Sequence, residues 1–306
     1  MFFSSLSILP IRNQLRVDTF GCLIFLILFA LPTNAQDDGE SQECFQEDTQ
    51  CVEEGQWNFA VSFGLGLRTN PLSKSSNIPL LILPEISYYQ GNFFIENLDF
   101  GYRLMDTNDA SVTLIATPSY DSVFFNRWDP GNLLVNLSSF GGVSSPTFDG
   151  TEQDITTQIN SDELNNRKFS YLGGFEYNMK FDDNLLQLTA LTDLTNTHSG
   201  KEIRFAWAHS FNSIVSSTLG LTWKDKKLSN YYYGVEPDEI IDDRGAYDAG
   251  ASVSPFVRIT LNNPTSDNNS WRLSLEYQKL GKQIARSPIL EDDYVVTFYV
   301  GKRFGF

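Results

Sequence analysis

Apolar and polar side chains alternate along the last segment of the chain, residues 294–306. One face carries Tyr294, Val296, Phe298, Val300, Phe304 and Phe306, whereas Gly301, Arg303 and Gly305 lie on the other. Successive side chains of a β-strand point to opposite faces, so this two-residue period is strand periodicity. The segment is therefore predicted to be a strand with one apolar face and one face of small or charged residues.

The same alternation recurs through the chain from Trp57 onward. A soluble sandwich and a membrane barrel share this pattern, since both place apolar and polar side chains on opposite faces. Aromatic residues concentrate at the ends of the alternating segments, where membrane barrels carry their interfacial girdles. The pattern therefore favours a membrane β-barrel. These aromatic residues are Trp57, Phe169, Phe181, Trp223, Trp271 and Phe306.

Counting the alternating segments gives about eleven clear strands. A bacterial barrel with both termini in the periplasm needs an even number, and residues 131–140 supply a twelfth strand. Short turns then fall at one end and long connections at the other. We predict an all-β fold, a transmembrane antiparallel β-barrel of about twelve strands, with about ten as the alternative. The segments are 57–68, 79–90, 93–105, 110–124, 131–140, 169–181, 184–195, 201–211, 213–224, 249–262, 269–280 and 293–306.

Composition narrows the way in which the chain can enter a membrane. The chain has 306 residues, 14% of them aromatic, and its mean hydropathy is −0.23. No stretch after residue 35 approaches the ~20 apolar residues of a transmembrane helix, so insertion must use strands. The net charge of −16 argues against a nucleic-acid partner, because phosphate binding needs clustered Lys and Arg.

The first 35 residues have the pattern of a secretory signal peptide. Arg12 and Arg16 precede an apolar run at residues 20–31, and small residues ending at Ala35 precede Gln36. The apolar run is shorter than a membrane-spanning helix, which favours a cleaved signal over an anchor. Cys22 lies inside this run, which argues against a lipoprotein anchor. The mature chain is predicted to begin at Gln36.

Residues 36–56 form an acidic segment before the predicted barrel at 57–306. They contain Cys44 and Cys51 among eight acidic residues, and such acidic runs are usually solvated tails. In an oxidising periplasm two cysteines at this spacing can close a small loop. We predict a periplasmic segment with a possible Cys44–Cys51 disulfide, and two free thiols are the alternative.

A group of motif residues lies in the last third of the chain. They are Tyr231, Tyr232, Tyr233, Gly234, Val235, Ser254, Pro255, Ser287, Pro288 and Asp293. Together with residues 81–94, 247–250 and 277–281, these motifs resemble those of the MipA/OmpV family, the MltA-interacting outer-membrane proteins. The resemblance covers nearly all of the chain from Trp57, whereas the acidic segment and the long stretch 126–166 depart from the family.

The resemblance implies a protein of the Gram-negative outer membrane that acts as a scaffold. The best-known family member brings a lytic murein transglycosylase together with a penicillin-binding peptidoglycan synthase. A narrow channel or osmotically regulated porin-like protein is the alternative. Phe304 and Phe306 resemble the C-terminal signal through which outer-membrane proteins reach the barrel assembly machinery. Outer-membrane lipid and lipopolysaccharide are the other expected partners.

The chain offers little for catalysis, and we predict neither an enzyme, a cofactor nor a metal. A Ser–His hydrolase needs a histidine placed against a nucleophile and an orienting acid. The histidines are His198, in an apparent external turn, and His209, in a lipid-facing register. Neither is followed two residues later by a serine, as in lipid A deacylases of similar architecture. An enzyme that uses a pair of carboxylates is the alternative that the sequence leaves open.

Two further groups of charged residues have alternative interpretations. The loop 236–248 is rich in carboxylates, which can bind Ca²⁺ or Mg²⁺. It lacks EF-hand spacing, which favours a hydrated loop instead. Charges on the predicted inward face can pair across a narrow lumen or line a channel. These inward residues are Arg103, Glu176, Lys180, Arg204, Arg258, Arg272, Glu276 and Arg303.

Overall fold

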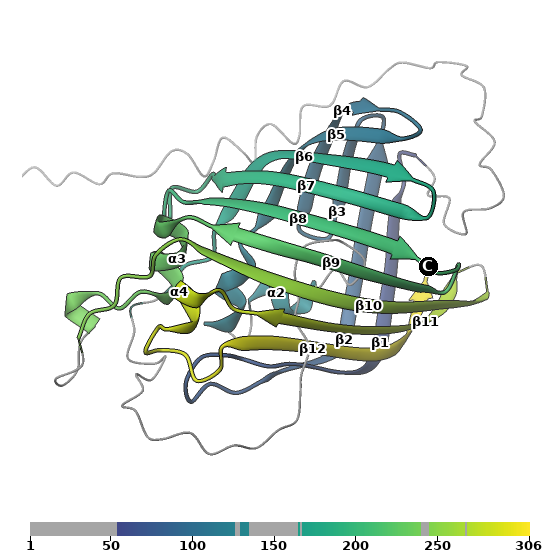
Figure 1. Ribbon diagram of the computed structural model, residues 1–306. Coiled ribbons are helices and arrows are strands. Elements are labelled where there is room, and N and C mark those ends of the chain that lie inside the picture. Colours follow the sequence, from purple (N-terminus) through teal and green to yellow (C-terminus); the bar gives the residue numbers. More distant parts are fainter. Residues whose placement is uncertain (1–53, 126–128, 135–164, 166, 240–244, 267) are drawn as a thin grey trace, which may run out of the picture. The chain divides into compact units, whose positions relative to one another are not determined.

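Twelve antiparallel strands close into a barrel in the computed structural model, which describes residues 54–125, 129–134, 165, 167–239, 245–266 and 268–306 (Figure 1). Each strand pairs with its neighbours in the chain, and β1 pairs with β12. The strands are β1 Trp57–Arg68, β2 Ile78–Gln90, β3 Phe93–Glu96, β4 Asp99–Asp106, β5 Ala110–Pro118, β6 Tyr171–Phe181, β7 Asn184–Asp193, β8 Lys201–Ser210, β9 Val215–Lys224, β10 Ser252–Ser266, β11 Asn269–Lys279 and β12 Tyr294–Gly305.

The alternation in the sequence becomes an apolar outside and a polar inside. Large apolar side chains lie on the outer surface, such as Leu65 at 70% exposure and Phe175 at 58%. Inward positions carry buried polar residues, among them Ser62 and Thr297. A lipid-facing wall needs this arrangement, because lipid solvates apolar side chains while the lumen satisfies polar ones. None of the described helices is long and apolar enough to span a membrane.

Glycines make room for one aromatic ring on the inner wall. Tyr299 of β12 is fully buried, and a Cβ at Gly64, Gly66 or Gly301 would lie within 2.8 Å of its side chain. A side chain at any of these positions would collide with the ring. Tyr299 therefore lies flat against a wall that lacks side chains, and it forms a cluster there with Ile78, Leu80 and Leu83 of β2.

The predicted total of twelve strands is confirmed, but one predicted strand is wrong. Residues 130–133 form the short helix α2, Pro130–Leu133, and residues 135–140 lie outside the described part. The twelfth strand comes instead from the predicted segment 93–105, which splits into β3 and β4. Asn97 adopts a left-handed φ of 54°, and its side-chain oxygen accepts the Ile86 N–H at 2.9 Å. Asparagine tolerates this conformation, so it permits a tight turn inside an alternating run.

The predicted strand 110–124 is also wrong at its end. It stops at Pro118, after which Tyr120–Phe124 form a 3₁₀-helix, η1. Proline lacks an N–H for the strand ladder, and the polar residues that follow it interrupt the apolar alternation. The chain turns here into the lumen, where Phe124 packs on the cluster around Tyr299. We call η1 and α2 together the plug (Figure 1).

The two ends of the barrel differ. The turn end carries the tight connections after β2, β4, β6, β8 and β10, and the C-terminus lies there (Figure 1). The loop end carries the longer connections, with α3 (Lys226–Tyr233), η3 (Pro237–Glu239) and α4 (Lys282–Ala285). Short turns face the periplasm in bacterial barrels, so the turn end is the periplasmic one.

The N-terminal predictions fall outside the described residues. The signal peptide 1–35, Cys44 and Cys51 all lie in residues 1–53, so the cleavage and the disulfide stay predictions. Chain contacts divide the protein into the units Met1–Asp48 and Thr49–Phe306. Every described residue belongs to the second unit.

Candidate functional site

The tyrosines of the family motif lie on α3, which caps the loop end. Asp225 begins this helix by accepting the Leu228 N–H at 2.9 Å. Tyr232 and Tyr233 are buried, whereas Tyr231 is partly exposed and accepts the Lys168 N–H at 2.8 Å. The helix therefore seals the barrel mouth with aromatic rings and, at the same time, bonds the backbone of the chain that enters β6.

Tyr233 joins this cap to the plug. Its hydroxyl donates to Asp121 Oδ1 at 2.6 Å, and Lys224 of β9 donates to Asp121 Oδ2 at 2.6 Å. Burial, and then the negative charge of Asp121, raise the pKa of Tyr233 well above its usual value. Tyr233 is thus a neutral donor at every physiological pH. Asp121 links three elements, η1, α3 and β9, and holds the plug in the lumen.

The other motif residues lie on the segments that pack beside the cap. Ser254 Oγ in β10 accepts the Gly281 N–H at 3.0 Å, and Ser287 donates to the Tyr233 carbonyl at 2.5 Å. Val235 pairs with Tyr247 in an isolated bridge. Pro255 pairs with Leu221 of β9, and Gly234 caps α3. Pro288 is half-buried, and Asp293 forms an ion pair with Lys279. Most of the motif therefore gathers at the loop end.

The predicted signal residues at the C-terminus lie at the turn end. Phe304 is on the outer face of β12, where its ring makes an edge contact with Phe63 at a centroid distance of 6.1 Å. Phe306 is 82% exposed, and its N–H donates to the Phe59 carbonyl at 2.9 Å.

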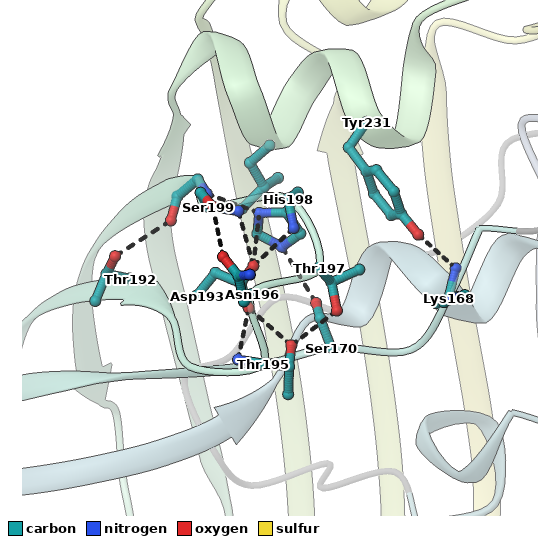
Figure 2. Close-up of polar contacts among 12 residues, drawn as sticks. Lys168, Ser170, Thr192, Asp193, Thr195, Asn196, Thr197, His198, Ser199 and Tyr231 are labelled. Carbon is teal, nitrogen blue, oxygen red and sulfur yellow. Dashed lines mark hydrogen bonds and ion pairs between the residues drawn. The ribbon is translucent and has the colours of Figure 1, made fainter. Parts of the chain in front are cut away.

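Figure 2 shows a serine, a histidine and an aspartate side by side at the loop end. Ser170 Oγ lies 3.2 Å from His198 Nε2, and His198 Nδ1 lies 3.8 Å from Asp193 Oδ2. Sequence analysis placed His198 in an external turn but did not pair it with Ser170 or Asp193. The three residue types are those of a hydrolase triad, so the protonation of the ring decides what the cluster can do.

The ring has the wrong tautomer for a general base. His198 Nδ1 accepts the Gly200 N–H at 2.9 Å, so the proton of the neutral ring is on Nε2. Nε2 therefore donates to Ser170 Oγ, whereas a triad needs it to accept the serine proton. Burial lowers the pKa of His198, which keeps the ring neutral. Ser170 is fully buried and also contacts the Tyr232 hydroxyl at 3.1 Å. The cluster ties loop 194–200 to the cap.

His209 lies on β8 toward the turn end. Its Nδ1 is 3.1 Å from Asn184 Oδ1, and its ring meets Phe211 edge to face at 4.8 Å.

The acidic loop is partly held by one buried ion pair. Arg167 binds both oxygens of Glu239, at 2.7 and 3.0 Å, and donates to the Gly234 carbonyl at 3.1 Å. Burial raises the pKa of Glu239, but the bonds from Arg167 and two backbone N–H groups outweigh it and lower the pKa. Residues 240–244 are not described. The described residues contain no group of three or more His, Cys, Asp or Glu side chains placed to hold a metal ion.

Several ion pairs lie inside the lumen. Arg258 pairs with Glu276, while Glu85 accepts from Arg272 at 2.6 Å and from Arg303 at 2.7 Å. Arg68 donates to Asn132 of the plug at 3.0 Å. These inward charges therefore pair with one another and with the plug, as one of the two sequence interpretations expected.

A chamber of about 440 Å³ remains on the other side of the lumen. Its wall comes from β3 to β8, and it opens beside the β4–β5 turn at the turn end. Tyr120 of the plug lies at its inner limit, with the Arg204 guanidinium 5.9 Å from the Tyr120 ring. The plug thus separates this chamber from the loop end. The charged side chains on its wall are Glu96, Asp99, Arg103, Asp106, Asp109, Glu176, Lys180 and Arg204.

One protein family matches nearly the whole barrel. The model of the family described as MltA-interacting protein MipA matches residues 61–306, which is most of the chain. The chain belongs to the MipA family. Members similar to this chain carry outer-membrane names, and the protein is an outer-membrane β-barrel.

Three relatives illustrate this similarity. The MltA-interacting protein of Escherichia coli K12 is 22% identical over 260 residues, covering 83% of this chain and 93% of the relative. Outer membrane protein Omp26La of Vibrio anguillarum is 26% identical, with 63% of this chain and 71% of the relative covered. OmpV of Vibrio cholerae is 25% identical, with 52% and 61% covered.

Solved structures similar to this chain are outer-membrane barrels. An outer membrane channel from Pseudomonas putida F1 matches with a TM-score of 0.38 and 11% identity, covering 86% of this chain and all of that one. A loop-deletion mutant of OmpT from Vibrio cholerae gives a TM-score of 0.31 and 10% identity, covering 83% and 100%. These scores are too low to support a functional conclusion.

Sequence reasoning missed the residues that organise the lumen. Asp121 was assigned to a strand, and its pairing with Lys224 and Tyr233 depends on the chain turning inward after Pro118. The available signal was the polar run Ser119, Asp121 and Ser122, which breaks the alternation of the preceding strand.

Proposed function

We propose that the protein is a non-enzymatic scaffold of the outer membrane. It holds a lytic transglycosylase at the periplasmic face and brings it to a penicillin-binding peptidoglycan synthase. Membership of a family described by its interaction with MltA supports the first partner. The synthase rests on the resemblance of the motif residues to the best-known family member.

The plug is the observation that favours a scaffold over a channel. It lies in the lumen toward the loop end and is held by Asp121, Lys224, Tyr233 and the Arg68–Asn132 bond. A barrel of about twelve strands is already narrower than the aqueous porins of about 16 to 18 strands. With the plug in position, the periplasmic face and its chamber are the accessible parts of the interior.

Purification from intact cells tests the scaffold. The tagged full chain is crosslinked in its own cells, purified, and its captured proteins are identified, with an unrelated tagged barrel as the control. Enrichment of a lytic transglycosylase together with a penicillin-binding protein is the expected result. Recovery of only the barrel assembly machinery and lipopolysaccharide, the partners expected of any such barrel, rules the scaffold out.

A narrow channel is the second candidate, because the chamber leads from the periplasm to the plug. Single-channel recording in a planar bilayer separates the two functions. A scaffold with a fixed plug gives no steady conductance. Regular, ion-selective steps from the unmodified protein favour the channel.

A further inference from the structure

The chamber at the turn end has an excess of negative charge that the protein does not neutralise. Arg204 pairs with Glu202, and Arg103 pairs with Asp106 at 3.3 Å, so these two cations are already matched. Lys180 and Asp109 carry opposite charges near the rim, where their backbones are joined by a hydrogen bond from the Lys180 N–H to the Asp109 carbonyl at 2.7 Å. The remaining wall charges are the carboxylates of Glu96, Asp99 and Glu176.

All three carboxylates receive hydrogen bonds from neutral groups, and the donor to Asp99 is the Thr117 side chain. The Tyr89 hydroxyl donates to Glu96 at 2.6 Å. Asn178 and Thr189 donate to the two oxygens of Glu176 at 2.9 and 3.3 Å. Such bonds stabilise a carboxylate but leave its charge in place. The three charges therefore remain together on one wall.

Asp99 is the carboxylate that most needs a ligand. It is only 9% exposed, and among the described residues its Oδ1 atom has no hydrogen-bond partner. A buried carboxylate oxygen without a donor is costly, because the charge has lost its water without gaining a substitute. Asp99 lines the chamber and sits at the start of β4, well inside the rim.

The three carboxylates come from three different strands, β3, β4 and β6. Among the described residues, no group of three or more His, Cys, Asp or Glu side chains is placed to hold a metal ion. An extended cation can instead place one ammonium group near each carboxylate. The chamber of about 440 Å³ lies within the ~300 to 1,000 Å³ usual for small-molecule sites.

We propose that the chamber is a binding site for a linear organic cation with two or more primary ammonium groups, a diamine or polyamine. One ammonium lies beside Asp99 and the other reaches Glu96 or Glu176. The ligand enters from the periplasm, because the plug closes the other end. Ammonium groups donate several hydrogen bonds to carboxylates, and these charge-assisted bonds are stronger than neutral ones.

Calorimetric titration of the full folded chain in detergent with spermidine tests this site. Wild type is expected to bind with saturation at one site. Asp99→Asn keeps the size of the side chain but removes the charge, and it should weaken binding at least about tenfold, which corresponds to about 1.4 kcal/mol. Asp183→Asn, in the β6–β7 turn outside the chamber, removes the same charge and should leave the affinity unchanged.

A second variant tests the position of the site without changing any charge. Thr113 points into the chamber and is 4% exposed, so Thr113→Phe should fill the space and abolish saturable binding. Folding of every variant is checked by the heat-dependent migration of the barrel in gels. Non-saturable binding to wild type, or equal affinity of wild type and Asp99→Asn, overturns the proposal. Neither result affects the crosslinking test of the scaffold.

Discussion

The two ends of this barrel use their residues in opposite ways. At the loop end, long connections fold over the mouth, and Lys224 and Tyr233 both donate to the buried Asp121 carboxylate. At the turn end the connections are tight and the chamber wall keeps carboxylates with no cation of their own. The loop end is therefore closed by residues that bond one another, whereas the turn end leaves surface and charged side chains available for partners in the periplasm.

Of the changes that test this difference between the ends, removing Asp121 should lower the free energy of unfolding the most. Asp121→Ala removes the carboxylate that pairs with the largely buried Lys224 ammonium, and breaking a buried ion pair typically costs about 3 to 5 kcal/mol. The free energy of unfolding, measured by denaturant titration in detergent, should fall by that amount. Asp109→Ala changes an exposed aspartate at the turn end and should stay within about 0.5 kcal/mol. Equal losses in the two variants would contradict the difference between the ends.

The double variant Asp121→Leu with Lys224→Met sharpens the same test. Replacing both members of a buried ion pair with apolar residues is often close to neutral. The double variant should therefore be more stable than Asp121→Ala, although the plug loses its fixed position. Conductance steps that appear in this variant and not in wild type would identify the plug as the barrier.

Tyr233→Phe should have an intermediate effect. It deletes the buried hydroxyl that donates to Asp121, and bonds to charged groups contribute about 1.5 to 3 kcal/mol. Tyr88→Phe is the matched change at the turn end, where the hydroxyl bonds Gln90 in an exposed position. The same unfolding measurement should show little change there. A loss at Tyr88 as large as that at Tyr233 would argue against a tightly bonded cap.

The smallest effect should come from the titration of His198. The folded protein lowers the pKa of this histidine, so the unfolded chain binds its proton more readily. The neutral His198 ring therefore contributes its full stabilisation above the pKa of the unfolded chain, about 6.5. This stabilisation is lost as the pH falls through the lower pKa of the folded protein. Protection of the loop 194–200 from hydrogen exchange should decrease on acidification.

His198→Gln supplies the control for this pH dependence. Glutamine keeps a donor for Ser170 but does not titrate in this range. The variant should show a smaller change in loop protection between neutral and mildly acidic pH. A response as steep as that of wild type would assign the pH dependence to another group.

Much of the fold was predictable because a membrane barrel constrains every strand in the same way. Lipid demands apolar side chains at alternate positions, so β1, β6 and β12 could be identified from the sequence. The turn at Asn97 and the inward path after Pro118 were not predicted. Both depend on single polar residues, Asn97 and Asp121, which bond groups on other strands.

The functional sites were less predictable for the same reason. The motif residues Tyr231 to Val235 were identified by resemblance, but their role as a cap depends on partners such as Ser170 and Asp121. The chamber residue Asp99 falls within a predicted strand and has no local signal. Its environment arises only when β3 to β8 curve around the lumen.

Site-specific crosslinking in living cells tests the central claim, that partners bind the turn end. A photoreactive residue is placed at Asn108 in the β4–β5 turn or at Asn196 in the exposed loop between β7 and β8. Capture of a lytic transglycosylase from Asn108, and none from Asn196, is the predicted result. Capture from Asn196, or from neither position while the protein is folded in the outer membrane, would contradict the account.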